Sequence, residues 1–214
     1  MEVNMISIRN EQIKDYRSAE EVARDAFWNL YDPGTDIHAV INQLRLHEDF
    51  IPEMTFVIEK DGEIIGGIYS TKSKIIRNNA EEMATITFGP VFIVPKYHRQ
   101  GMGKKMITHA IEAAKRSGYK AIAILGYPYH YKPYGFVSGK EYNISSEDGK
   151  FYSGLQILEL EEKALDNIKG YAVFSDAYEV DPGFAEEYDK EFPIKEKKVE
   201  PSQKEYEIAC QTLA

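Results

Sequence analysis

Two glycines flanked by cations lie in the middle of the chain, within the stretch His98-Arg-Gln-Gly-Met-Gly-Lys-Lys105. Because Gly101 and Gly103 lack a Cβ, the backbone can turn tightly there and an anion can approach it closely. If the amides of residues 99–104 point inward at the start of a helix, they and the helix dipole can bind a phosphate. Arg99 and two lysines add positive charge to a chain of net charge −9. This is a candidate phosphate-binding loop; the alternative is a plain helix start.

Two common nucleotide-binding motifs do not match the spacing of this loop. A P-loop has a glycine five residues before its Gly-Lys pair and a Ser or Thr after it, where this chain has His98 and Lys105. A Rossmann fingerprint has a third glycine where this chain has Met106. The loop therefore belongs to neither motif.

A second unusual feature is Gly89-Pro90, which interrupts a run of β-forming residues. Proline lacks a ladder donor, so it suits an edge strand, a bulge or a place where neighbouring strands part. We expect the freed edge of residues 91–94 to pair with an extended, amide-bearing ligand whose phosphate end reaches the loop. Pantetheine joined to a pyrophosphate has that shape.

The third feature is a tyrosine-rich turn, Leu125-Gly-Tyr-Pro-Tyr-His-Tyr-Lys-Pro-Tyr-Gly-Phe136. Ligands of open α/β sheets tend to bind beyond the carboxyl ends of parallel strands, where we expect this turn to lie. A tyrosine hydroxyl there can give a proton to a departing thiolate at neutral pH. The alternative for each tyrosine is an ordinary half-buried aromatic side chain.

The surrounding pattern predicts the elements that position these features. A strand over 84–94, a helix over 101–117 and a strand over 120–126 form a βαβ unit with parallel strands. Asp61-Gly62 predicts an antiparallel hairpin within 54–69. Further elements are expected at 7–9 (strand), 11–28 (helix), 36–47 (helix) and, from about 181, a peripheral helix and tail. The fold class is therefore α/β or α+β.

Composition narrows the class of protein. The 214 residues are 43% apolar and 29% charged, enough for one sizeable core. No apolar run approaches the length of a membrane span and the N-terminus lacks a leader, so we expect a cytoplasmic protein with no membrane partner. The single cysteine, Cys210, agrees with a reducing compartment. The net charge of −9 argues against a nucleic-acid partner and suits a cationic substrate better.

Together these stretches resemble the GNAT superfamily of acyl-CoA-dependent N-acetyltransferases, whose loop reads Gln/Arg-x-x-Gly-x-Gly/Ala. The matching residues are His98-Arg-Gln-Gly-Met-Gly103, followed by Tyr131-Lys-Pro-Tyr-Gly-Phe136. Residues 24–30 and 86–136 resemble a bacterial subgroup of predicted acetyltransferases. The resemblance implies a mostly antiparallel central sheet with splayed fourth and fifth strands and helices on both faces. It implies an acetyltransferase domain over 1–160, followed by an acidic C-terminal extension over 161–214 packed on or near it.

The resemblance also implies acetyl-CoA as co-substrate, no metal, and direct attack by the amine of a small-molecule or peptide acceptor. Its general acid corresponds to Tyr131, and a backbone amide near 91–93 would hold the thioester carbonyl. The implied cofactor-binding residues are Val91, Phe92, Ile93, His98, Arg99, Gln100, Gly101, Met102, Gly103 and Lys104.

Two positions depart from the family pattern. His98 replaces Gln or Arg, which we expect to tune affinity, since backbone amides bind most of the phosphate. Strand 84–94 has no carboxylate, so the general base is unassigned, with Glu53, His38, His130 or a water chain as candidates. This gap leaves a non-catalytic acyl-CoA-binding sensor as the alternative function.

The acceptor is not specified by any motif. Segments 27–55 and 170–192 are expected to help form its site, because family members vary these flanks. A homodimer is common in families of this type, but no pattern in the chain specifies one.

Overall fold

Nine strands form one mixed sheet within residues 5–214, the part of the chain that the computed structural model describes. Residues 1–4, which the predicted range 1–160 includes, lie outside the described residues. The main strand order is β1-β2-β3-β4-β5-β8-β6, and β9 pairs with β3 and β7. The strands are β1 (Ile6–Asn10), β2 (Phe56–Lys60), β3 (Glu63–Arg77), β4 (Glu82–Ile93), β5 (Ala121–Leu125), β6 (Val137–Ser138), β7 (Ile144–Ser145), β8 (Leu155–Glu159) and β9 (Gly170–Val173).

Most neighbouring strands are antiparallel, as predicted, and β4 and β5 form the expected parallel pair. The short pair β7–β9 is also parallel and was not predicted. Asp61 and Gly62 form the predicted hairpin turn between β2 and β3, both with positive φ. Beyond Tyr69, β3 continues to Arg77, where it pairs with β4 and β9. A side-chain bond adds to this pairing, since Ser73 Oγ lies 2.7 Å from Thr85 Oγ1.

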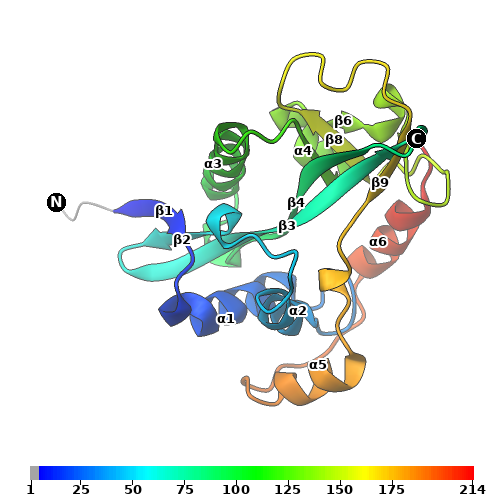
Figure 1. Cartoon of the computed structure of the whole chain (residues 1–214). Helices are drawn as coiled ribbons and strands as arrows, with labels where there is room; N and C mark the ends of the chain where they lie inside the picture. The colour runs from blue at the N-terminus through cyan, green and yellow to red at the C-terminus, as the bar shows by residue number, and fades with distance from the viewer. Residues whose placement is uncertain (1–4) are drawn as a thin grey trace.

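Helices cover both faces of this sheet (Figure 1). The described helices are α1 (Tyr16–Phe27), α2 (Ile37–Leu44), α3 (Met102–Arg116), α4 (Pro128–Tyr131), α5 (Pro182–Asp189) and α6 (Pro201–Gln211). One face carries α3, and the opposite face carries α1 and α2. None of these helices has the length and apolar content needed to cross a membrane.

Helix α3 forms because its apolar residues recur at helical spacing and face the sheet. Met102, Met106 and Ala110 follow each other at four-residue intervals and are buried. Gly118, with a φ of 81°, follows the end of the helix, where glycine favours termination. The helix therefore has a fixed rotation on the sheet, and its N-terminus points to the end of β4.

A buried ion-pair network fixes α1 and α2 against β3. The Arg45 guanidinium pairs with Glu20 and, at 2.7 Å, with Glu11, and these three side chains are almost inaccessible to solvent. The Tyr69 hydroxyl donates to the same Glu11 carboxylate. The Tyr69 ring stacks at 6.1 Å on Phe92 near the end of β4. Loss of one partner would leave a buried charge unpaired, so a substitution at Arg45 is expected to destabilise the packing of the helices on the sheet.

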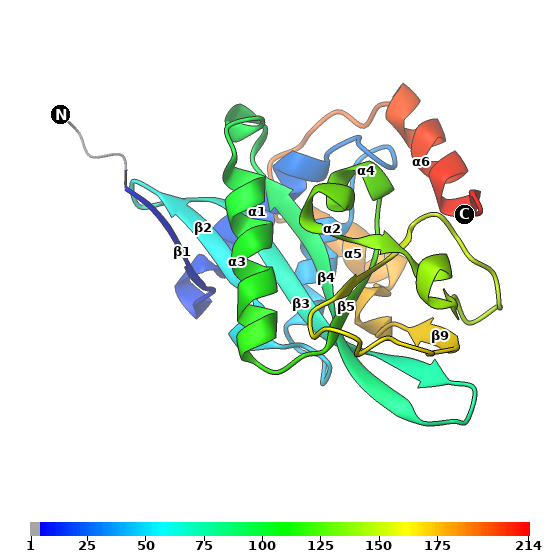
Figure 2. The same ribbon diagram turned by 90° about the horizontal axis from the view of Figure 1, so that it is seen from above.

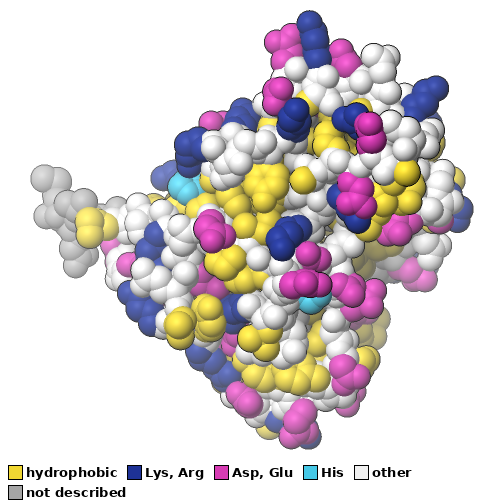
Figure 3. Space-filling model, viewed as in Figure 1, with side chains coloured by type: hydrophobic (Ala, Val, Ile, Leu, Met, Phe, Trp, Pro, Cys, Tyr) yellow, Lys and Arg dark blue, Asp and Glu magenta, His cyan; other side chains and the backbone are white. Residues whose placement is uncertain are grey.

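The C-terminal extension packs along the same layer. Arg24 in α1 donates to Asp189 at 2.7 Å and to the Pro193 carbonyl at 3.1 Å, and Phe192 is buried beside it. Asp and Glu side chains crowd the lower part of the face in Figure 3, around α5. The extension also reaches the sheet, since β9 pairs with β3.

Candidate active site

The loop before α3 has the backbone shape of an anion cradle. Arg99 and Gly101 both have positive φ, 57° and 80°. Gly101 is the N-cap of α3, and within residues 5–214 no side chain caps that helix. The first amides of a helix have no partner inside it, so those of α3 can bind a ligand. A Cβ added to Gly101 would meet no atom within 4 Å, so the space in front of the turn is open.

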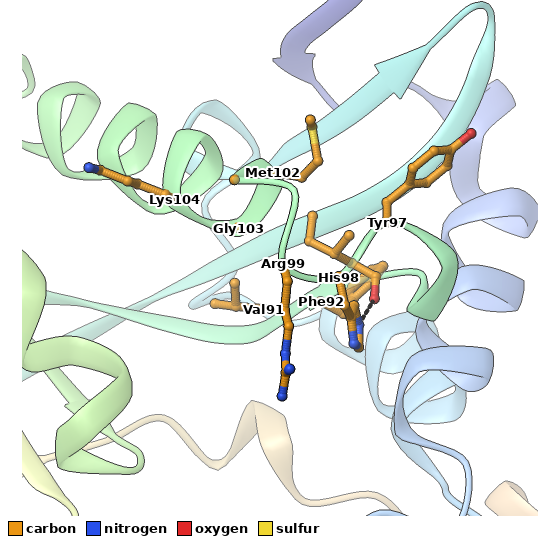
Figure 4. A pocket seen from close by; sticks show the side chains of 10 residues that line it. Val91, Phe92, Tyr97, His98, Arg99, Met102, Gly103 and Lys104 are labelled. Atoms are coloured by element: carbon orange, nitrogen blue, oxygen red, sulfur yellow. Dashed lines mark hydrogen bonds between the residues drawn. The ribbon is translucent and has the colours of Figure 1, made fainter.

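These residues line a pocket of about 440 Å³ at the junction of β4 and α3. Nine of the ten predicted cofactor-binding residues line it, and so does Tyr97, which the sequence analysis missed although it directly precedes the loop. The exception is Gln100, whose side chain turns away and donates to the Lys96 carbonyl at 2.9 Å. Arg99 and Tyr97 extend in opposite directions from the loop, and Lys104 lies along α3 (Figure 4).

The His98 side chain stabilises the loop by a hydrogen bond to the end of β4. Its Nε2 lies 2.7 Å from the Ile93 carbonyl oxygen, so in this contact the ring nitrogen donates (Figure 4). The imidazole thus joins the loop to the last residue of β4. This contact explains how histidine can stand where the family pattern has Gln or Arg: it fixes the shape of the loop while the backbone amides remain available.

The strand beside the pocket has a free backbone edge. β4 pairs with β5 at a single position, Ile86 with Ile122, and the two strands part beyond it. Gly89 and Pro90 fall in the bulge where the register with β3 shifts, so the expected interruption is present. Ile93 turns its carbonyl to His98, whereas the Val94 amide bonds β3 at Ile65. Since alternate residues point to opposite sides of a strand, Val91 and Ile93 direct their amides into the gap.

Phe92 has a different role from its two neighbours. Its backbone points toward β3, and its ring packs among Tyr69 and Phe27 on the α1 and α2 face. The side chain is 3% exposed. It therefore forms the floor of the gap rather than a hydrogen-bonding position.

Tyr131, the predicted general acid, ends α4, which follows the last residues of β5. Its ring contacts Phe136 at 5.4 Å and fills the space over Gly126, where a Cβ would lie 2.6 Å from the ring. Its hydroxyl makes no hydrogen bond to any of residues 5–214. Burial, with a smaller contribution from Tyr134, raises the pKa of Tyr131 to about 12. The phenol therefore keeps its proton at neutral pH.

The three candidate bases lie in different places. Glu53 lies close enough to Tyr119 to raise the pKa of that tyrosine, and Tyr119 follows the C-terminal end of α3. The pocket lies at the N-terminal end of the same helix, about 22 Å away, so Glu53 is remote from the pocket. His38 is buried 3.1 Å from Asp189, and burial lowers its pKa to about 4. His130 is in α4, directly before Tyr131, and burial lowers its pKa too. Only His130 shares an element with the predicted acid.

One histidine-carboxylate cluster among residues 5–214 has the composition of a metal site. In it, the Asp49 amide donates to His47 Nδ1 at 3.1 Å, so the neutral ring carries its proton on Nε2. That Nε2 lies 3.2 Å from an Asp176 carboxylate oxygen. The arrangement suits a hydrogen bond and offers a metal no imidazole lone pair.

Comparisons with known proteins agree with this geometry. The sequence model of the Acetyltransferase (GNAT) family matches residues 19–136. A curated relative, the uncharacterized N-acetyltransferase YhbS of Escherichia coli K12, is 21% identical over 139 residues, 65% of this chain and 81% of the relative.

Solved structures share the fold. The Escherichia coli YhbS structure in complex with CoA has a TM-score of 0.72 at 18% identity, over 83% of this chain and 94% of that one. A GNAT family acetyltransferase from Brucella melitensis in complex with acetyl-CoA has a TM-score of 0.66 at 20% identity, over 82% and 99%. The family match spans more than half of the sequence and includes the strand, the loop and the tyrosine turn, and so this chain belongs to the Acetyltransferase (GNAT) family.

Proposed function

We propose that this protein transfers an acetyl group from acetyl-CoA to a primary amine by direct attack. The observation that carries the proposal is the uncapped N-terminus of α3, which opens beside the gap between β4 and β5. The CoA and acetyl-CoA complexes of two structural neighbours support this choice of co-substrate.

Different residues of the pocket bind different parts of acetyl-CoA. The amides of residues 101–104 and the Arg99 guanidinium bind the pyrophosphate. The edge of β4 that faces the gap bonds the amides of the pantetheine arm, as an added strand does. When bound, acetyl-CoA supplies a thioester carbonyl for attack by an unprotonated amine, with the CoA thiolate as leaving group.

Three groups of this chain then act on the reacting atoms. The amide of Val91 or Ile93 donates to the carbonyl oxygen as it gains negative charge, a contribution that is large in a dry site. Tyr131 donates to the departing thiolate. The proton of the amine leaves through water, and His130, whose lowered pKa favours the neutral imidazole, is the proposed acceptor. Attack by a neutral amine on a thioester requires no metal.

The pH profile of kcat/KM should distinguish the ionisation of the substrate amine from that of Tyr131. Because the pKa of Tyr131 is raised to about 12, its proton is retained throughout the range in which an ordinary tyrosine, of pKa near 10, ionises. We expect kcat/KM to rise as the amine deprotonates and to show no fall by pH 10.5. The measurement is kcat/KM from pH 6 to pH 11, with circular dichroism at each pH to confirm folding. A falling limb centred near pH 10 in folded protein would contradict the assignment.

The first test of the proposal is calorimetric titration with acetyl-CoA, with ATP and NAD as controls, followed by a screen of amines for thiol release. We expect saturable binding of acetyl-CoA alone and turnover of at least one amine. Binding without any turnover would favour the sensor, for which the argument is that residues 84–94 contain no carboxylate. Folded protein that binds none of the three ligands would overturn the proposal.

A further inference from the structure

The C-terminal helix α6 meets the segment that follows α1 and the turn that follows β5 (Figure 2). The Tyr206 ring of α6 stacks on Tyr31 at 4.2 Å and lies 6.4 Å from Tyr127. Gln203 of the same helix donates to the Asn29 carbonyl at 3.1 Å. Three tyrosines from three distant parts of the sequence therefore form one surface.

This surface is continuous with the end of β4. Tyr31 contacts Phe27 at 5.7 Å, and Phe27 contacts Phe92, which lines the pocket, at 6.4 Å. Burial and then the hydroxyls of its neighbours, Tyr131 among them, raise the pKa of Tyr31. Tyr31 thus links Tyr206 of α6 to the aromatic side chains that reach the end of β4.

The hydroxyls of Tyr31 and Tyr127 are available to a ligand. Neither makes a hydrogen bond within residues 5–214, and both side chains are partly exposed. An accessible hydroxyl can bond a polar group of a ligand in place of water.

The surface carries two exposed carboxylates. Asp32 follows Tyr31 and Glu205 precedes Tyr206, both are exposed, and neither forms an ion pair with any of residues 5–214. Burial, Cys210 and, more weakly, Tyr127 and Asp32 raise the pKa of Tyr206 to about 12. Lys197 and Lys204 border the region but pair with neither carboxylate. A ring surface with unpaired carboxylates attracts cations and repels anions.

We propose that the acceptor is a small amine with a second cationic group, which binds the aromatic–acidic surface formed by Tyr31, Tyr127, Tyr206, Asp32 and Glu205. The inference rests on the proposed acetyl transfer and names its substrate class. The reacting amine, unprotonated, reaches the gap beside Tyr131. The second ammonium remains charged over the tyrosine faces and is neutralised by the two carboxylates.

The test compares 1,6-diaminohexane with 6-amino-1-hexanol, which has the same length but a neutral distal end. We expect kcat/KM of the wild type to be about tenfold or more higher for the diamine, well beyond the factor of two that its two equivalent ends supply. Diamines of two to eight carbons then locate the best spacing. Asp32→Asn and Tyr206→Leu should each bring the ratio toward two, by raising the KM of the diamine with acetyl-CoA affinity retained.

Asp32→Asn guards against a folding artefact, because the Asp32 side chain is exposed and makes no ion pair or side-chain hydrogen bond within residues 5–214. Glu162→Gln, a change at a carboxylate that is 87% exposed and lies in the segment between β8 and β9, is the matched charge control and should leave the ratio unchanged. Equal efficiency for the two amines across the series overturns the inference and leaves acetyl transfer intact. Acetyl-CoA binding with no amine turned over overturns acetyl transfer, and the inference with it.

Discussion

Replacing Tyr131 with Phe should lower kcat by about a hundredfold and leave the affinity for acetyl-CoA nearly unchanged. The change removes one oxygen whose hydrogen bond forms only as the thiolate departs. A group that acts only in the transition state affects kcat and kcat/KM equally. Steady-state kinetics with a saturating amine and calorimetry with acetyl-CoA measure the two quantities separately.

The Tyr131→Phe substitution should remove the hydroxyl without disturbing the packing around the ring. The Tyr131 ring is held by Phe136 and by the space over Gly126, contacts that Phe keeps. Its hydroxyl has no hydrogen-bond partner within residues 5–214, so no buried group is left unpaired. We therefore expect the melting temperature to stay close to that of the wild type.

Tyr134→Phe is the matched control, since Tyr134 lies in the same turn and its hydroxyl has no assigned role. Its kcat should remain within about twofold of the wild type, the spread expected for a surface change. An unchanged kcat in Tyr131→Phe would remove Tyr131 from the mechanism. A loss of equal size in both variants would indicate a structural role for the turn.

Gly101→Glu should abolish measurable binding of acetyl-CoA. A charge about 5 Å from a phosphate costs about 3 kcal/mol at the effective dielectric of a protein surface, a loss of about a hundredfold or more in Kd. The φ of 80° adds about 1–2 kcal/mol of backbone strain for any residue with a Cβ. The electrostatic contribution is therefore larger than the steric one, and it acts only on the anionic ligand.

Two variants separate the contributions to this loss. Gly101→Asn introduces a side chain that tolerates positive φ without charge, so it should keep most of the affinity. Gly149→Glu places the same charge at a turn with a φ of 79° and open space around it, away from the pocket-lining residues. It should bind acetyl-CoA normally. If Gly101→Glu binds as tightly as Gly149→Glu while folded, the loop is only a helix start.

The features that the sequence predicted correctly depend on local chemistry. Asp61-Gly62 specifies its hairpin because both residues tolerate positive φ, and the spacing of Met102, Met106 and Ala110 specifies α3. The bounds of shorter helices were less accurate. The helix expected over 36–47 ends at Leu44, since the following residues turn toward β3.

The features that the sequence did not predict depend on distant contacts. Tyr206 lies in a segment that looks like a charged tail, and its contact with Tyr31 becomes visible only in the folded chain. The bond from His98 to the Ile93 carbonyl could not be inferred either, because nothing in the sequence shows which way the imidazole turns. Local patterns therefore predicted the pocket-lining loop, whereas the proposed acceptor surface depends on the tertiary structure.

Because β4 and β5 pair only at Ile86 and Ile122, the sheet consists of two halves that are joined at this one position. On the open side of this junction the backbone lacks the ladder bonds that hold other neighbouring strands together. A ligand whose amides bond the free edge of β4 acts there as a missing length of strand, while its phosphates fasten the start of α3. On the proposed mechanism acetyl-CoA is therefore part of the architecture: the co-substrate that is consumed in each turnover also completes the sheet.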